Sequence, residues 1–184
     1  MPVAQNPTNR RRLQSGFTLL EALIAIVIMS VGILSLAVVY AQGIQVANKT
    51  QLDYIAEKQA EQALETVFAA RDSKLLTWTS IQNVSNGGVF LDNAQPLLVP
   101  GADGLYGTAD DGPTPVVVII NAGPDKILGT ADDVTMPLTN MTRTIAIVNV
   151  PNETGLRQIT ITLNYYSGNM HMQYTLVSYI SEFS

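Results

Sequence analysis

Residues 16–42 decide the organisation of this chain, and they begin Gly16-Phe17-Thr18-Leu19-Leu20-Glu21. An apolar run without any charged residue follows from Ala22 to Ala41. About 20 apolar residues, each rising ~1.5 Å in a helix, are enough to cross the hydrocarbon core of a bilayer. Glu21 places one carboxylate near the start of this run. Because an unpaired charge in lipid is costly, we interpret Glu21 as a functional residue that needs a partner.

The residues before the run form a polar leader. Residues 1–16 show no helical period and include the cluster Arg10, Arg11 and Arg12. In an ordinary secretory signal the cleavage site follows the apolar stretch. Here the candidate cleavage site precedes it, so the mature chain would keep the run. The alternative is an uncleaved anchor whose arginines stay on the cytoplasmic side, but that alternative does not account for Gly16 or Glu21.

The basic leader, Gly16, Phe17, the Thr18-Leu19-Leu20 step and Glu21 together resemble the type IV prepilin signal. The continuation from Glu21 to Leu34 is most similar to minor pilins of the PilV type and to related pseudopilins, and the resemblance covers residues from about 10 to 70. It implies cleavage between Gly16 and Phe17 by a prepilin peptidase, followed by N-methylation of Phe17. It also implies that Glu21 pairs with the new amino terminus of a neighbouring subunit. The physical reason is that an ammonium and a carboxylate in lipid relieve each other's cost.

Glu21 has a second, purely structural interpretation. Thr18 and Glu21 have the spacing of a capping box, in which both side chains satisfy backbone N–H groups at a helix start. The two interpretations are compatible, but they predict different responses to Glu21→Gln. That variant removes the charge and keeps the capping geometry, so it should still assemble if capping alone matters.

A single helix is predicted over residues 17–74, with residues 17–41 crossing the membrane. No proline occurs between Pro7 and Pro96. From Leu52 onward apolar residues recur at helical spacing, which predicts an amphipathic second half. Its acidic residues recur at steps of four on another face, which is typical of a solvated surface: Asp53, Glu57, Glu61 and Glu65.

The middle of the chain contains a repeat. Residues 101–111 read GADGLYGTADD, residues 123–133 read GPDKILGTADD, and seven of the eleven positions are identical. Each copy contributes three carboxylates, namely Asp103, Asp110 and Asp111 in the first and Asp125, Asp132 and Asp133 in the second. The run Val116–Ile120 between them is β-branched and predicts a strand.

These loops are candidate calcium sites. Ca²⁺ takes about six to eight oxygen ligands from carboxylates and carbonyls on a bent loop, and the repeats resemble the Asp/Gly-rich calcium loops of several exported bacterial proteins. They lack the twelfth-position glutamate of an EF-hand. Plain turns without an ion are the equal alternative. Lys126 replaces Gly104, which predicts weaker binding by the second copy.

The chain after Asn140 is predicted to be β. Three runs rich in Ile, Val, Thr and Tyr are separated by turn signals, and they cover residues 143–150, 156–166 and 170–181. An antiparallel meander would cover the amphipathic half of the helix with one face. The fold class is therefore α+β and pilin-like, with a leader (1–16), a long helix (17–74) and a β-rich head (75–184).

Composition excludes several classes of function. There is no cysteine, which rules out disulfides and thiolate chemistry. The net charge is −5, and loss of the leader leaves seven basic against fifteen acidic residues, or −8. Such an acidic chain is not expected to bind nucleic acid, which requires clustered Lys and Arg. His171 is the one histidine, no nucleophile elbow or phosphate loop occurs, and we expect a surface or packing role for it rather than catalysis.

Our leading expectation is thus a structural subunit and not an enzyme: a minor pilin, held in the inner membrane with a periplasmic head until it enters a pilus (fimbrium). Its expected partners are other pilin subunits and the prepilin peptidase/methyltransferase. A pseudopilin of a type II secretion or competence (DNA-uptake) machine is the first alternative, with a periplasmic fibre. A membrane-anchored module for calcium binding or cell adhesion is the second.

Overall fold

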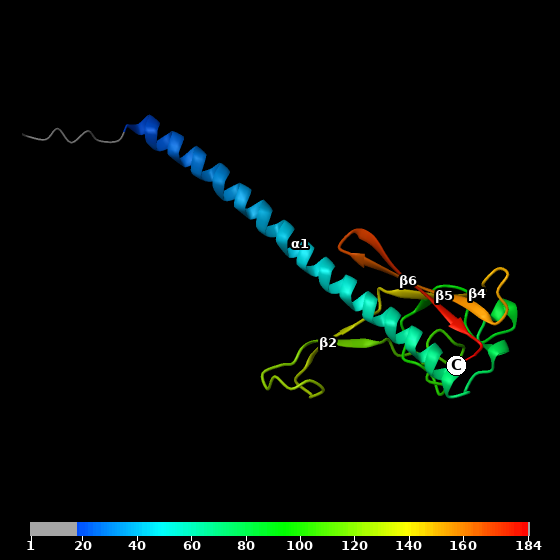
Figure 1. The fold of residues 1–184 in the computed structure, drawn as a ribbon. Helices are drawn as coiled ribbons and strands as arrows, with labels where there is room; N and C mark the ends of the chain where they lie inside the picture. The colour runs from blue at the N-terminus through cyan, green and yellow to red at the C-terminus, as the bar shows by residue number, and fades with distance from the viewer. Residues whose placement is uncertain (1–17, 184) are drawn as a thin grey trace, which may run out of the picture. The chain divides into compact units, whose positions relative to one another are not determined.

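The computed structural model describes residues 18–183 of the chain. Its first element is the helix α1, Leu19–Asp72, of 54 residues (Figure 1). The helix passes through Gly32 and Gly43 without a break. It ends two residues before Lys74, the end predicted from the sequence. Lys74 has a φ of 59°, and this left-handed conformation cannot continue a right-handed helix.

The chain divides into two units between Ile44 and Gln45. In the first unit the apolar side chains of α1 are exposed. By length and composition α1 is apolar enough to cross a membrane. In the second unit one stripe of α1 is buried, and it consists mostly of alanine and β-branched residues: Ile55, Ala56, Gln59, Ala60, Ala63, Val67 and Ala70. These side chains belong to the same hydrophobic core as the buried residues of the strands.

The second unit contains a four-stranded antiparallel sheet in the order β1-β4-β5-β6. The strands are β1 (Gln95–Pro96), β4 (Thr142–Asn149), β5 (Leu156–Ser167) and β6 (Met170–Ser181). The meander predicted from the three C-terminal runs is confirmed. The short strand β1 was not predicted, because two residues ending in a proline carry no periodic signal.

Buried and exposed residues alternate along the strands, and the buried ones form the core. In β5 every second residue is buried from Arg157 to Ser167, and these residues face α1 and the loops. Ile159, Ile161 and Leu163 are fully buried, as the alternating pattern of the sequence predicts. Phe90, Leu97, Leu105 and Leu138 from the connecting segments complete the core. Burial of these side chains fixes α1 against one face of the sheet.

Two 3₁₀ turns, Trp78–Ser80 and Val84–Asn86, follow the helix. A separate hairpin is formed by β2 (Val117–Asn121) and β3 (Val134–Pro137), which pair antiparallel. The strand predicted between the two repeats is therefore confirmed. Val118 and Met136 are opposite each other in the hairpin, and both pack against the core. The second repeat connects β2 to β3 (Figure 1).

Candidate functional site

The start of α1 carries the first candidate site. Gly16 and Phe17, the predicted processing residues, lie outside the described residues. Thr18 caps the helix, because its Oγ1 accepts a hydrogen bond of 3.3 Å from the backbone N–H of Glu21. This is one half of the capping box. Among residues 18–183, no hydrogen bond or ion pair involves the Glu21 carboxylate. The cap is therefore made without the charge of Glu21, which is left available to another group.

The surface that follows Glu21 is apolar on all sides. Exposed side chains occur at every turn of α1 between Leu19 and Val46 and include leucine, isoleucine, valine and methionine. A continuous exposed surface of this kind is far larger than soluble monomers tolerate. It belongs in lipid or against the same surface of other helices.

The two Asp/Gly repeats carry the second candidate site, and they fold alike. In the first copy the Oδ2 of Asp110 accepts from the N–H of Asp103 at 3.2 Å, and the Oδ1 of Asp103 accepts from the N–H of Leu105 at 2.8 Å. In the second copy Asp132 and Asp125 accept from the equivalent N–H groups at 3.3 and 2.8 Å. The last aspartate of each copy accepts from a glycine N–H, at 2.8 Å for Asp111 and 2.6 Å for Asp133.

A threonine side chain stabilises each loop through a hydrogen bond to an aspartate. Thr108 donates from Oγ1 to Asp110 at 2.8 Å, and Thr130 donates to Asp132 at 2.7 Å. These hydrogen bonds are the main reason that the pKa values of both carboxyls lie below their ordinary value. The first glycine of each copy is required for a related reason. A Cβ at Gly101 would collide with Asp110, and a Cβ at Gly123 would collide with Asp132.

The surroundings of the two loops differ. The first lies over the core, where Leu105, Tyr106 and Thr108 are buried. The second is mostly exposed, including Ile127 and Leu128 at its tip. Burial raises the pKa of Asp111 in the first loop, while the N–H of Gly107 and the charge of Arg143 oppose that rise.

Arg143 lies beneath the first loop, on the inner face of β4. It is 2% exposed, and its three guanidinium nitrogens have no hydrogen-bond partner among the described residues. Its guanidinium carbon lies 4.4 Å from the centre of the Tyr106 ring, a cation–π contact. Burial lowers its pKa to about 10. No sequence pattern indicates that Arg143 is buried, because a charged side chain within an alternating strand is expected to face water.

The predicted metal ligands stay within their own loops. Within residues 18–183, no three acidic or histidine side chains are grouped so that they could hold a metal ion. The six carboxylates instead accept hydrogen bonds from the backbone and from threonine. One atom differs, since the Oδ1 of Asp133 is buried and has no hydrogen-bond partner in the described chain. Calcium binding stays a prediction.

Trp78 and His171 have structural roles. The Trp78 ring packs against the core and lies 4.1 Å from the guanidinium carbon of Arg157. Arg157 also donates to the carbonyl oxygens of Trp78 and Ile81. His171 is exposed and makes an edge contact with Tyr166, with ring centres 5.2 Å apart. The surface position of His171 agrees with the surface or packing role expected from the sequence.

Comparison with known proteins yields one match. The family model of the prokaryotic N-terminal methylation motif matches residues 11–37. This segment includes Gly16, Phe17, Glu21 and much of the exposed apolar part of α1. No curated protein and no solved structure matches the chain. The motif, together with one long apolar helix packed against an antiparallel sheet, supports a type IV pilin-like or pseudopilin subunit that is anchored in a membrane before assembly.

Proposed function

We propose that this protein is a minor pilin, a structural subunit of a type IV pilus-like filament and most similar to the PilV type. In this proposal a prepilin peptidase/methyltransferase cleaves the chain after Gly16 and methylates Phe17. The head is then periplasmic until the subunit leaves the inner membrane. The observation that carries the proposal is the methylation motif, which continues directly into the exposed apolar surface of α1.

Two physical arguments support assembly through α1. The apolar surface between Leu19 and Val46 avoids water either in lipid or in a bundle with the apolar helices of other subunits, so the same surface serves before and after assembly. The Glu21 carboxylate has no partner among the described residues, and a methylated amino terminus on a neighbouring subunit would supply one. Pairing would fix the axial position of one subunit against the next.

A pseudopilin of a type II secretion or competence machine remains the first alternative, because the motif is common to both classes. A membrane-anchored calcium-binding or adhesive module is the second. It is favoured by one observation, the buried and unpartnered Oδ1 of Asp133 in a loop that holds three carboxylates.

The test is to purify the protein from the membranes of its native host and to measure the mass of its amino-terminal peptide. We expect a chain that begins at Phe17 with one added methyl group. An intact leader, in cells that process their other prepilins, would overturn both the pilin and the pseudopilin proposals. Deletion of the gene separates those two, since loss of surface filaments or of motility indicates a pilus and loss of secretion indicates a pseudopilus.

A further inference from the structure

The strand β6 forms an unprotected edge of the sheet. It pairs with β5 without a bulge from Ser167↔Met170 to Leu156↔Ser181, and no described strand lies on its other side. Natural edge strands are protected by lysine, proline, bulges or short length. The twelve residues of β6 contain no proline, glycine, lysine, arginine or carboxylate. The opposite edge is β1, which has two residues and ends in Pro96.

Both ends of β6 indicate which backbone groups face this edge. Gly168 and Asn169 form a two-residue turn, so Ser167 and Met170 are a hydrogen-bonded pair. At the other end the N–H of Glu182 donates to the carbonyl of Gly155 at 2.8 Å. Because bonded pairs alternate in antiparallel strands, the even-numbered residues of β6 bond to β5. The N–H and C=O groups of the odd-numbered residues point to the open edge.

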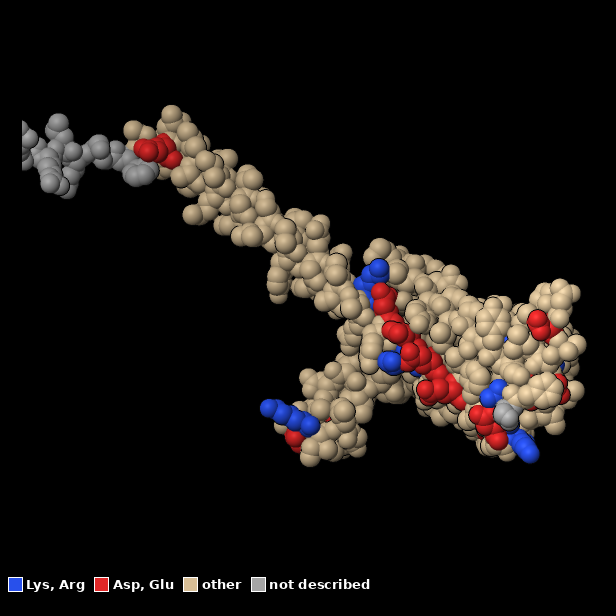
Figure 2. Space-filling view, in the orientation of Figure 1, with Lys and Arg blue, Asp and Glu red and all other residues tan. Residues whose placement is uncertain are grey.

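A row of carboxylates on α1 runs beside β6. Figure 2 shows this row as a red stripe along the helix, and the residues are Asp53, Glu57, Glu61 and Glu65. A groove of about 400 Å³ is lined by Asp53 and Glu57 on one side and by Met172, Gln173 and Tyr174 of β6 on the other. Burial raises the pKa of Tyr174, and the charges of Glu57 and Glu61 raise it further, which agrees with their position beside the strand.

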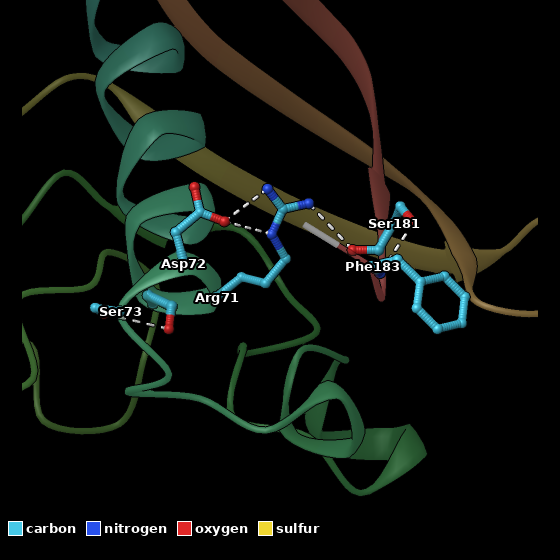
Figure 3. A network of polar contacts seen from close by, with 6 residues as sticks. Arg71, Asp72, Ser73, Ser181 and Phe183 are labelled. Atoms are coloured by element: carbon cyan, nitrogen blue, oxygen red, sulfur yellow. Dashed lines mark hydrogen bonds and ion pairs between the residues drawn. The ribbon is translucent and has the colours of Figure 1, made fainter.

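Beyond the groove, a basic side chain of this chain already joins the edge of β6 to α1. At the C-terminal end of β6, the Nη1 of Arg71 donates a hydrogen bond of 3.1 Å to the carbonyl oxygen of Ser181. The same guanidinium contacts the Oδ1 of Asp72 at 2.7 Å from both Nε and Nη2 (Figure 3). One cation thus connects a carbonyl at the open edge to a carboxylate on α1. Within the row, the Nζ of Lys58 lies 2.6 Å from the Oε2 of Glu61. Among the described residues, this contact is the one ion pair that involves the row.

We propose that the groove between β6 and the acidic row binds an extended, basic segment of a different protein chain. The segment would add a strand to β6 and place Lys or Arg side chains against the row. The row extends over twelve residue steps of the helix, or ~18 Å, which matches about five or six residues of a strand. Backbone hydrogen bonds would supply affinity and the charges would select the partner. The inference concerns the head and does not depend on cleavage at Gly16.

A second copy of this chain is a poor occupant because it lacks exposed basic residues in one segment. Of the seven basic residues after Gly16, Arg143 and Arg157 are buried. Arg71 and Lys58 are paired on their own helix. The other three are Lys49, Lys74 and Lys126, which are far apart in sequence. Neither β2 nor β3 contains a basic residue.

Binding of synthetic peptides to the full chain in detergent micelles tests the proposal. The probe is a fluorescein-labelled octapeptide in which Lys alternates with Val and Thr, read by fluorescence anisotropy. One control peptide replaces every Lys by Glu, and a second keeps the lysines but has a central proline. We expect the basic peptide to bind at least about tenfold more tightly than either control, since charge and strand pairing are both needed.

Variants of the chain locate the binding. Thr175→Pro removes an edge N–H while keeping the β5–β6 bonds, and we expect about tenfold weaker binding, whereas Thr175→Val should bind as the parent does. Glu57→Gln should weaken binding about two- to fivefold, and Glu153→Gln, which removes the same charge far along the chain, should not.

Three results would overturn the proposal. The first is no binding of the basic peptide, or equal binding of the proline peptide. The second is unchanged affinity in Glu57→Gln, a variant that leaves the strand intact even if Thr175→Pro does not fold. The third is self-association of the chain that competes with the peptide, which would make a second copy the occupant.

Discussion

The hydroxyl of Tyr165 on β5 donates a hydrogen bond of 2.6 Å to the Oδ1 of Asp53 on α1. Tyr165 is 2% exposed, so this bond is made at the boundary between the core and the acidic row. It shows that the row, predicted to be a solvated face, also has a structural contact at its first member.

Tyr165→Phe removes this bond and leaves the Asp53 carboxylate partly buried. We expect the free energy of unfolding to fall by about 1–3 kcal/mol, measured by denaturant titration. Burial, reinforced by Asp53, raises the pKa of Tyr165 above its ordinary value of 10. The folded chain therefore holds this proton more tightly than the unfolded chain, so the contribution is complete below pH 10 and is lost as the pH rises beyond it. Tyr165→Phe should lack that alkaline loss, and identical pH profiles would contradict this assignment.

The side chain of Asn83 makes two hydrogen bonds to the backbone of β4, as a neighbouring strand would do. Its Nδ2 donates to the carbonyl of Ile145, and its Oδ1 accepts from the N–H of Ile147, both at 2.7 Å. Asn83→Ala would leave two buried backbone groups unsatisfied, and we expect a loss of about 2–4 kcal/mol in the free energy of unfolding. Asn86→Ala, at an exposed position nearby, is the matched control and should change stability by less than about 0.5 kcal/mol. Equal effects of the two would refute this role.

Lys126 and Gly104 occupy the same position of the two repeats, with φ values of 58° and 70°. The left-handed conformation costs a residue with a Cβ about 1–2 kcal/mol. Lys126→Gly should therefore raise the melting temperature slightly, and Gly104→Lys should lower it. A fall in melting temperature for Lys126→Gly would show that the lysine side chain makes a contact that outweighs the strain.

Glu21→Gln separates capping from assembly. The helix cap uses the backbone N–H of Glu21, so it survives the substitution. We expect unchanged protein in the membrane but at least about tenfold less in sheared filaments, because the amino terminus of the neighbour loses its partner. Immunoblots of the two fractions measure this. Glu21→Asp serves as the charged control, and normal incorporation of Glu21→Gln would show that assembly does not need the charge of Glu21.

Calcium binding by the repeated loops has a thermodynamic signature. If the loops bind Ca²⁺, the melting temperature of the full chain in detergent should rise with millimolar Ca²⁺ and not with Mg²⁺. Asp103→Ala combined with Asp125→Ala should abolish the rise. Because each of these aspartates also accepts a backbone hydrogen bond, the comparison is made within each variant, with and without the ion. No shift in the parent protein would leave the loops as plain turns.

The sequence predicted the elements with strong periodicity. The long helix and the three C-terminal strands follow from apolar spacing, and the strand between the repeats follows from its β-branched run. The structure has all of them. The sequence could not predict contacts that depend on how distant segments meet. The buried Arg143, the Arg157–Trp78 contact and the Asn83 bridge each join segments that are far apart, and no local pattern indicates them.

The same distinction applies to the candidate sites: their local patterns are visible in the sequence, and their contacts are not. Glu21 was predicted as a candidate because a carboxylate in an apolar run is unusual in any fold. The six loop aspartates were predicted as calcium ligands from their repeated spacing, and their hydrogen bonds within the loops were not predicted. A signal was present, however. Asp103 and Asp125 each accept from the N–H two residues later, which is the Asx turn that Asp commonly forms.

The two repeats fold alike although one covers the core and the other is exposed. Their shape is set by eleven residues that bond mainly to one another, so the surroundings contribute little. We therefore expect a copy inserted at another exposed position of a host protein to keep its conformation. Duplication of such a self-contained turn therefore adds exposed surface to the head without a change in its core.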